Sequence, residues 1–166
     1  MKVLALALLA IALGACVAQK PNPIPIPSIP VSKMGGNWYV IFYYSSNVTN
    51  TDGFTCFKQK WTPTDSAMQI AQTVTHNGKS QNTNFVANFK NNGNSIWTIN
   101  GVDYAWLNLD PINHSYGLIG RMDDQECLMV STNPKIGFDY MQAELQIARQ
   151  EGYNIQVDKV IRPTNN

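Results

Sequence analysis

The sequence predicts an all-β domain, in which eight antiparallel strands form a barrel or sandwich and one helix follows. Three observations predict this class. Short segments rich in aromatic and β-branched residues recur along residues 38–132, turn dipeptides such as Asn77-Gly78 separate them, and helical spacing of apolar residues marks the tail, residues 136–151. Regular short strands joined by hairpin turns are typical of antiparallel barrels and sandwiches. A length of 166 residues fits one domain.

The first residues are expected to form an export signal. A short positive start precedes the unbroken apolar run of residues 3–15, which is too short to span a bilayer as a helix and is followed by small residues. A signal peptide of residues 1–18 would release a secreted chain from Gln19. The alternative is a bacterial lipoprotein signal of residues 1–15, which would leave Cys16 lipidated in an outer-membrane lipoprotein. We favour secretion, because the chain also carries two glycosylation sequons.

A proline-rich arm, residues 19–33, follows the signal. Prolines alternate in PNPIPIPSIP, residues 21–30, and such a pattern fits neither a helix nor a central strand. We expect an extended polyproline II segment that acts as a spacer. The alternative is an arm pressed onto the domain by three isoleucines, Ile24, Ile26 and Ile29.

The strands are predicted from runs of apolar residues between turn signals. Asn77-Gly78 is the strongest hairpin signal in the chain. The predicted strands cover residues 38–46, 54–61, 67–75, 83–90, 95–99, 103–109, 114–121 and 126–132.

The tail is predicted to form a helix over residues 136–151. Its apolar face is formed by Phe138, Met141, Leu145 and Ala148, which follow helical spacing. Gly152 stands where a helix end needs a positive φ. A short ninth strand is then expected around residues 155–157. One helix cannot cover two sheets, so it is expected to lie against the outside of a closed barrel.

Composition excludes several classes of function. Only 14% of the residues are charged, and the formal net charge is +1, without a basic cluster. A nucleic-acid partner is therefore not expected, because tracking phosphates needs a positive field. No stretch after the signal is long and apolar enough to predict a transmembrane helix.

The segment Gly36-Asn37-Trp38-Tyr39 resembles the G-x-W-Y motif that opens the first strand of lipocalins. The order of arm, motif, eight strands, helix and short final strand also agrees with that family. The resemblance covers nearly the whole exported chain, and residues 104–162 look most like the apolipoprotein D and bacterial lipocalin branch. It implies an eight-stranded antiparallel up-and-down barrel over residues 34–166, with one C-terminal helix and a short ninth strand.

Two further motifs of the family are incomplete. Asp110 alone remains of the T-D-Y motif between strands six and seven. Thr132 stands where the family has an arginine that packs over the motif tryptophan, although Pro134 after it is kept. The closed end of the barrel then lacks its usual cover, unless Arg121 or Lys33 replaces it.

The resemblance implies that the barrel carries a small hydrophobic ligand such as a fatty acid, sterol, retinoid or pigment. An eight-stranded barrel is just wide enough to hold one small ligand, and such binding needs no catalysis, metal or cofactor. The branch's inward positions imply a ligand set of Phe57, Gln59, Trp61, Ala105, Leu107, Leu109, Leu128 and Val130. Alternation of apolar residues adds Phe85, Ala87 and Phe89 on strand four. Strand one is apolar on both faces, so alternation cannot decide there, and Val40 and Phe42 are included because they share parity with Trp38.

Each of these residues is also explained by ordinary core packing. Gly36 and Trp38 are interpreted as structural, with Trp38 closing one end of the barrel. Trp106 falls out of phase with its neighbours and is expected to face the helix.

Two cysteines remain after export, Cys56 and Cys127. Both are expected near the open rim of the barrel and to point outward. We predict a disulfide between them, since exported chains meet an oxidising environment; two free thiols are the alternative. The branch usually pairs the Cys56 position with a cysteine in the C-terminal tail, where this chain has none.

Asn47-Val48-Thr49 and Asn113-His114-Ser115 are glycosylation sequons in predicted loops. His76 and His114 are expected at opposite ends of the barrel, so no Cys-His pair or metal site is predicted. The leading hypothesis is thus a non-enzymatic extracellular carrier. A lipid-modifying enzyme on the same barrel, or a defensive or structural protein with a filled barrel, are the alternatives.

Overall fold

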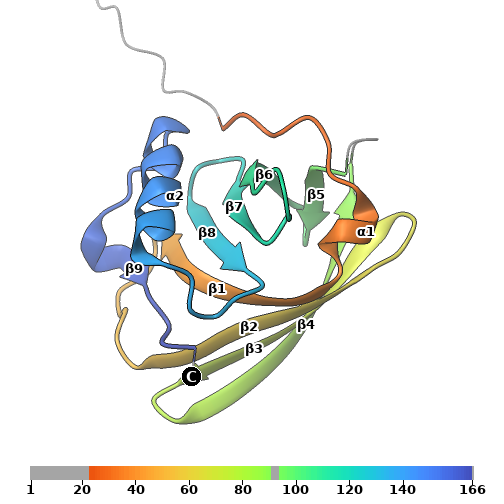
Figure 1. The fold of residues 1–166 in the computed structure, drawn as a ribbon. Coiled ribbons are helices and arrows are strands. Elements are labelled where there is room, and N and C mark those ends of the chain that lie inside the picture. The colour runs from red at the N-terminus through yellow and green to blue at the C-terminus, as the bar shows by residue number, and fades with distance from the viewer. Residues whose placement is uncertain (1–22, 91–93, 166) are drawn as a thin grey trace, which may run out of the picture.

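A computed structural model describes residues 23–90 and 94–165 of the chain. It confirms the expected fold, a closed barrel of eight antiparallel strands with one C-terminal helix (Figure 1). Consecutive strands pair from β2 to β8, and β1 closes the barrel by pairing with both β8 and β2. The strands are β1 (Gly36–Ser45), β2 (Phe54–Pro63), β3 (Ala67–His76), β4 (Lys79–Phe89), β5 (Ile96–Ile99), β6 (Val102–Leu109), β7 (Tyr116–Arg121) and β8 (Glu126–Ser131).

Two Asn-Gly turns set the register at one end of the barrel. Asn77 and Gly78 have φ values of 49° and 74°, and Asn100 and Gly101 have φ values of 51° and 79°. Positive φ at both central residues is the requirement of the tight hairpin turn that matches strand twist. The hairpins predicted at these dipeptides are confirmed by the pairing of β3 with β4 and of β5 with β6.

Two irregularities change which side chains face the interior. The pairing of β1 with β8 shifts between Val40 and Phe42, and the pairing of β6 with β7 shifts between Trp106 and Asn108. A bulge adds one residue to a strand and so reverses the alternation beyond it. Counting every second residue therefore predicts the inward-facing side chains on one side of a bulge but not on the other.

The buried apolar residues form two clusters, one inside the barrel and one between the barrel wall and the helix. The inner cluster contains Ile29, Met34, Trp38, Val40, Phe57, Trp61, Met68, Ile70, Ala87, Trp97, Trp106, Ile119 and Val130. The outer cluster contains Phe42, Tyr44, Ala105, Leu107, Leu118, Cys127, Met129, Met141, Leu145, Ala148, Tyr153, Ile155 and Val160.

Tryptophans fill the closed end of the barrel. Trp38 stacks on Trp61 with ring centroids 5.2 Å apart, and Trp106 meets both rings edge-on. The indole nitrogen of Trp38 donates to the Met34 carbonyl oxygen at 2.9 Å. Trp38, the motif tryptophan, is thus in contact with two further tryptophans at the closed end.

Of the two proposed substitutes for the missing motif arginine, only Lys33 lies at the closed end, in the short helix α1 (Val31–Met34). Arg121 is bound to acidic residues at the opposite end, and Lys33 is exposed. Thr132 instead donates its hydroxyl to the Ser115 carbonyl oxygen at 3.2 Å.

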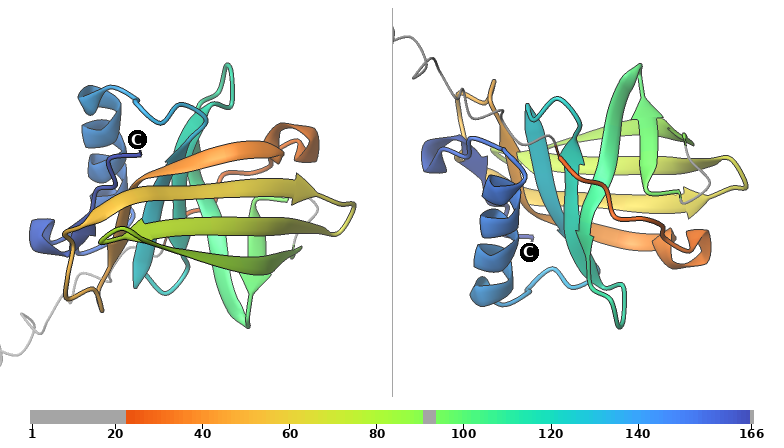
Figure 2. Two further views of the ribbon diagram at one scale, coloured as in Figure 1. Left: turned by 90° about the horizontal axis from the view of Figure 1, so that it is seen from below. Right: turned by 90° about the horizontal axis from the view of Figure 1, so that it is seen from above.

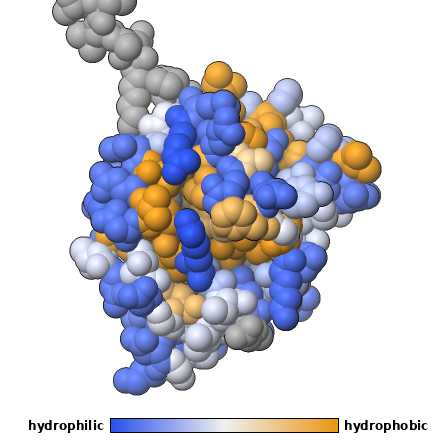
Figure 3. All heavy atoms as spheres, turned by 60° about the vertical axis from the view of Figure 1, so that its left-hand side comes forward, coloured by the Kyte–Doolittle hydropathy of each residue, from blue (hydrophilic) through white to orange (hydrophobic). Residues whose placement is uncertain are grey.

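Helix α2 (Phe138–Gln150) lies on the outside of the barrel over β6, β7 and β8 (Figure 1). Met141, Leu145 and Ala148 are buried as predicted, whereas Phe138, in the first turn, is 63% exposed. Gly152 has the positive φ predicted for it. The face of the molecule that carries α2 and β9 is largely hydrophilic, with smaller apolar areas between the polar side chains (Figure 3).

The arm is attached to the barrel and is not a simple spacer in the described part. The Ile26 amide donates to the Trp106 carbonyl oxygen at 2.9 Å, and Ile29 is buried in the inner cluster. Figure 2 (right) shows the arm running beside the barrel to the short helix α1 (Val31–Met34). Ile24 lies outside this contact, since it is 69% exposed.

The C-terminal residues close the seam where β1 and β2 separate. The ninth strand, β9 (Val160–Ile161), pairs with the outer end of β1, so the expected position around residues 155–157 is wrong. A short 3-10 helix, η1 (Val157–Lys159), precedes β9. Beyond β9, the Asn165 side chain donates to the Val40 carbonyl oxygen at 2.8 Å and accepts from the Phe57 amide at 2.9 Å. No helix in the described part of the chain is long and apolar enough to cross a membrane.

Candidate ligand-binding cavity

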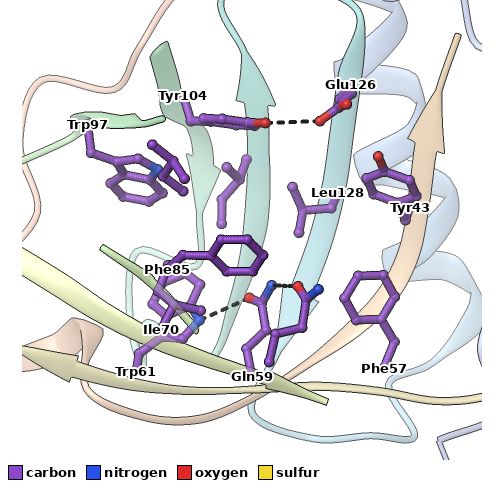
Figure 4. A pocket seen from close by; sticks show the side chains of 13 residues that line it. Tyr43, Phe57, Gln59, Trp61, Ile70, Phe85, Trp97, Tyr104, Glu126 and Leu128 are labelled. Atoms are coloured by element: carbon purple, nitrogen blue, oxygen red, sulfur yellow. Dashed lines mark hydrogen bonds between the residues drawn. The ribbon is translucent and has the colours of Figure 1, made fainter. Parts of the chain in front are cut away.

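The barrel encloses a cavity of about 210 Å³ between the tryptophan floor and the open end. Every one of the eight barrel strands contributes at least one side chain to it, as the close-up shows (Figure 4). The lining residues are Tyr43, Phe57, Gln59, Trp61, Ile70, Gln72, Phe85, Trp97, Ile99, Tyr104, Ile119, Glu126 and Leu128. Most of these side chains are aliphatic or aromatic, so the cavity suits an apolar molecule.

Two glutamines form a polar group on the β2–β3 wall. The Trp61 indole nitrogen donates to Gln59 Oε1 at 2.9 Å, and Gln59 Nε2 donates to Gln72 Oε1 at 2.8 Å (Figure 4). Gln59 is buried, so these bonds meet the need of its amide for partners inside the barrel. They also fix the orientation of Trp61 over the floor.

A second polar group lies across the cavity, where β6 and β8 approach the open end. The Tyr104 hydroxyl donates to Glu126 Oε2 at 3.0 Å (Figure 4). Arg121 Nη1 lies 3.5 Å from Glu126 Oε1, and Arg121 Nη2 lies 2.8 Å from Asp123 Oδ2. Burial, with the negative charge of Glu126 in second place, raises the pKa of Tyr43 to about 12 and also raises that of Tyr104.

Five residues of the predicted ligand set line the cavity: Phe57, Gln59, Trp61, Phe85 and Leu128. Their strands have no bulge between these positions, so alternation places them correctly. Five others pack in or against the inner cluster without lining the cavity: Val40, Ala87, Phe89, Leu109 and Val130.

Three predictions of inward-facing residues are wrong. Phe42, Ala105 and Leu107 belong to the outer cluster, beneath the helix and the C-terminal segment. For Phe42 the cause is the bulge after Val40, which ends the parity with Trp38. On β6 the assumed phase is reversed, so that Trp106 faces the interior and not the helix.

Sequence reasoning missed eight of the lining residues, and a signal was present for some of them. Glu126 lies two and four residues before Leu128 and Val130 on β8, which has no bulge, so it faces the same side of the sheet. Ile99 likewise lies two residues after Trp97 on β5. The missed residues are Tyr43, Ile70, Gln72, Trp97, Ile99, Tyr104, Ile119 and Glu126.

The predicted disulfide is wrong, since Cys56 and Cys127 are free cysteines. Cys127 is buried in the outer cluster, and β1 lies between its strand and that of Cys56. Burial raises the pKa of the Cys127 thiol far above its usual range. Cys16 and both cleavage sites lie outside the described residues.

The remaining predicted residues lie in loops or at strand ends. Gly36 opens β1 with a φ of 119°, and Pro134 follows β8. Asn47 and Asn113 are exposed in turns, as glycan acceptors must be, and their glycosylation stays a prediction. Within residues 23–90 and 94–165, no three His, Cys, Asp or Glu side chains are grouped so as to hold a metal ion.

Asp110 organises the loop between β6 and β7. Its carboxylate accepts hydrogen bonds from the Ser115 hydroxyl and from the amides of Ile112, Asn113 and Ser115. Burial favours protonation of Asp110, but these hydrogen bonds outweigh it and hold the pKa of the carboxyl below its usual range.

Comparison with known proteins agrees with this architecture. No protein-family model and no curated protein sequence matches the chain. Among solved structures, the chain is similar to the siderocalin Ex-FABP, which is described as functioning through dual ligand specificities. The TM-score is 0.62 at 12% sequence identity, and the match covers 79% of this chain and 93% of the other. At this identity the likeness is one of fold, and that fold is the lipocalin barrel.

Proposed function

We propose that this lipocalin-like barrel binds a small, mostly apolar molecule in its cavity and carries it outside the cell. The observation that carries the proposal is the cavity itself, an apolar space lined from all eight strands. The description of Ex-FABP as a protein with dual ligand specificities supports a binding role for the shared fold. The extracellular setting rests on the export signal expected in the sequence, with a membrane-anchored lipoprotein as its alternative.

The size of the cavity limits the ligand. At about 210 Å³ it is smaller than the roughly 300–1,000 Å³ usual for drug-sized ligands. We therefore expect a compact ligand, or one part of a longer chain whose remainder leaves through the open end. A fatty acid, sterol or retinoid remains in our proposal only in that second form.

Binding by burial alone supplies enough affinity for a carrier. Each methylene group transferred from water to an apolar site gains about 0.8 kcal/mol. Trp61, Phe85 and Leu128 offer this apolar surface without rearrangement of the barrel wall. We propose no catalytic role for the Cys127 thiol, because it faces away from the cavity and is deeply buried.

A protein whose barrel is filled by its own side chains is the weaker candidate. The packed inner cluster favours it near the floor, where tryptophans leave little space. The half of the barrel near its open end is not filled by side chains, because the cavity lies there, and this argues against a filled barrel.

Calorimetric titration with a series of 1-alkanols, from four to fourteen carbons, tests the proposal. Affinity is expected to rise about fourfold per added methylene, which corresponds to about 0.8 kcal/mol, until the chain outgrows the cavity. Absence of heat and of tryptophan quenching across the whole series would contradict it.

A pair of variants locates the binding. Leu128→Trp places a large side chain in the cavity and is expected to lower alkanol affinity at least tenfold. Val86→Trp adds the same side chain on the outer surface of β4, where Val86 is 54% exposed, and is expected to leave affinity unchanged. Equal affinities for the two variants would place the alkanol elsewhere.

A further inference from the structure

We propose that the cavity prefers ligands that carry a protonated amine on an apolar body, with Glu126 as the group that receives the amine. This inference rests on the proposed function and names the ligand class for the same site. It starts from the charges that face the cavity.

Glu126 is the only acidic or basic side chain among the described residues that line the cavity. No lysine, arginine or histidine is among these lining residues. A bound carboxylate would therefore meet a negative charge with no cation of the wall to balance it, whereas a bound amine would meet its counter-ion. A charged group is costly to bury in an apolar site unless a group of opposite charge pairs with it, as the carboxylate would pair with the amine.

The Glu126 carboxylate is held in place and keeps capacity to accept hydrogen bonds. Its side chain is 21% exposed, and the hydroxyl of Tyr104 fixes Oε2. A carboxylate offers about four acceptor sites. The contacts from Tyr104, Tyr43 and Arg121 therefore leave one acceptor site for an ammonium group that approaches from the cavity.

The neighbouring Arg121 does not cancel this charge. Its shorter contact, 2.8 Å, is made to Asp123, and its contact to Glu126 is 3.5 Å long. One guanidinium thus faces two carboxylates, and the three side chains together carry a net negative charge. The Arg121 side chain is 25% exposed, so water screens its repulsion of a cation.

Aromatic side chains extend the preference toward cations. Tyr43 on β1 and Phe57 on β2 lie side by side, with ring centroids 6.0 Å apart, and Tyr43 is the cross-strand neighbour of Leu128 on β8 (Figure 4). Phe85 and Tyr104 lie further along the same space (Figure 4). The faces of such rings attract a cation within about 6 Å. An apolar body with an ammonium end therefore meets the aromatic walls and the carboxylate together.

The test uses three probes that share one apolar body and differ in charge: 2-phenylethylamine, 2-phenylethanol and 3-phenylpropanoate. Calorimetry at pH 7 is expected to give amine binding about tenfold or more tighter than alcohol binding, since a hydrogen bond to a charged group is the stronger. The propanoate is expected to bind more weakly than the alcohol.

Two variants separate the carboxylate from a general charge effect. Glu126→Gln is expected to remove the advantage of the amine over the alcohol. Asp65→Asn makes the same charge change in an exposed turn at the closed end and is expected to keep the preference. Thermal unfolding of both variants checks that the barrel is intact, and the comparison of probes on the unmodified chain stands without them.

The outcomes distinguish this inference from the proposed function. Equal binding of amine and alcohol, or an amine preference that survives Glu126→Gln, would overturn the inference and leave an apolar-ligand carrier. If none of the three probes binds, and the alkanols fail as well, both proposals are overturned.

Discussion

Asn108 Nδ2 donates a 2.7 Å hydrogen bond to Glu144 Oε1, joining the outer face of β6 to the middle of α2. Glu144 is 1% exposed, and its second oxygen has no hydrogen-bond partner. Burial raises the pKa of this carboxyl to about 7, although the bond from Asn108 opposes the shift. The helix is thus attached to the barrel through an acid that resists ionisation.

This arrangement predicts that stability falls as pH rises. Between about pH 4.5, the ordinary value for Glu, and about pH 7, the folded state binds the proton more tightly than the unfolded state. The free energy of unfolding is therefore expected to decrease across this window, by on the order of 3 kcal/mol. Urea unfolding at a series of pH values measures it. In Glu144→Gln the decrease should vanish; a wild-type stability that is flat from pH 4.5 to 7 would contradict the assignment.

For Asp110 we expect the opposite effect of pH on the free energy of unfolding. Since its pKa is lowered in the folded state, its contribution is present above the usual carboxyl range and is lost as pH falls through the lowered value. Asp110→Asn replaces one acceptor oxygen with a donor and is expected to cost about 1–3 kcal/mol at pH 7. Asp65→Asn, in an exposed turn, is the control and should unfold like the unmodified chain. Equal urea midpoints for Asp110→Asn and the control would contradict this role.

The attached arm predicts a difference between two isoleucines of the same segment. Ile29→Ala empties a position that is 3% exposed within the inner cluster and is expected to cost about 2–4 kcal/mol. Ile24→Ala, at a position that is 69% exposed, is expected to change stability by less than about 0.5 kcal/mol. Urea unfolding of both variants measures the difference, and two equally stable variants would restore the spacer interpretation.

The free cysteines predict two rates of thiol labelling. In the chain from Gln19, Cys56 is expected to react with a thiol reagent in the native state, because it is partly exposed. Cys127 is expected to react only after unfolding, since it is buried and its thiol pKa is raised. Mass spectrometry counts the labels, and a denatured, unreduced protein that takes up no label would reveal the disulfide instead.

The barrel was predictable from the sequence because its signals are local. Each Asn-Gly turn and each alternating strand follows from a few adjacent residues. Phe57, Gln59 and Trp61, which the family resemblance implied, were placed together correctly. The phases of β1 and β6 were not predictable, because the bulges beside Val40 and Trp106 depend on pairing with a neighbouring strand. Parity with Trp38 therefore sent Phe42 to the wrong side, and the positions implied by the family resemblance did the same for Ala105 and Leu107.

The polar part of the site was missed for a different reason. In the sequence, Glu126 follows Asp123 and Asp124, and such a short acidic run is typical of a solvated turn. Only the closed barrel brings Tyr104 against Glu126 across β7. The four tryptophans that contact one another inside the barrel likewise come from four different strands, and no local pattern brings them together.

Binding inside the barrel is tested most directly by nuclear magnetic resonance of methyl-labelled protein titrated with 1-octanol. Methyl groups of Ile70, Ile99, Ile119 and Leu128 line the cavity. Leu118 and Leu145, in the outer cluster, serve as the internal reference. The account predicts saturable shifts of the four lining residues, with cross-peaks to the octanol chain, and unchanged signals from the two reference residues. Shifts confined to the outer cluster, or none at saturating octanol, would contradict it.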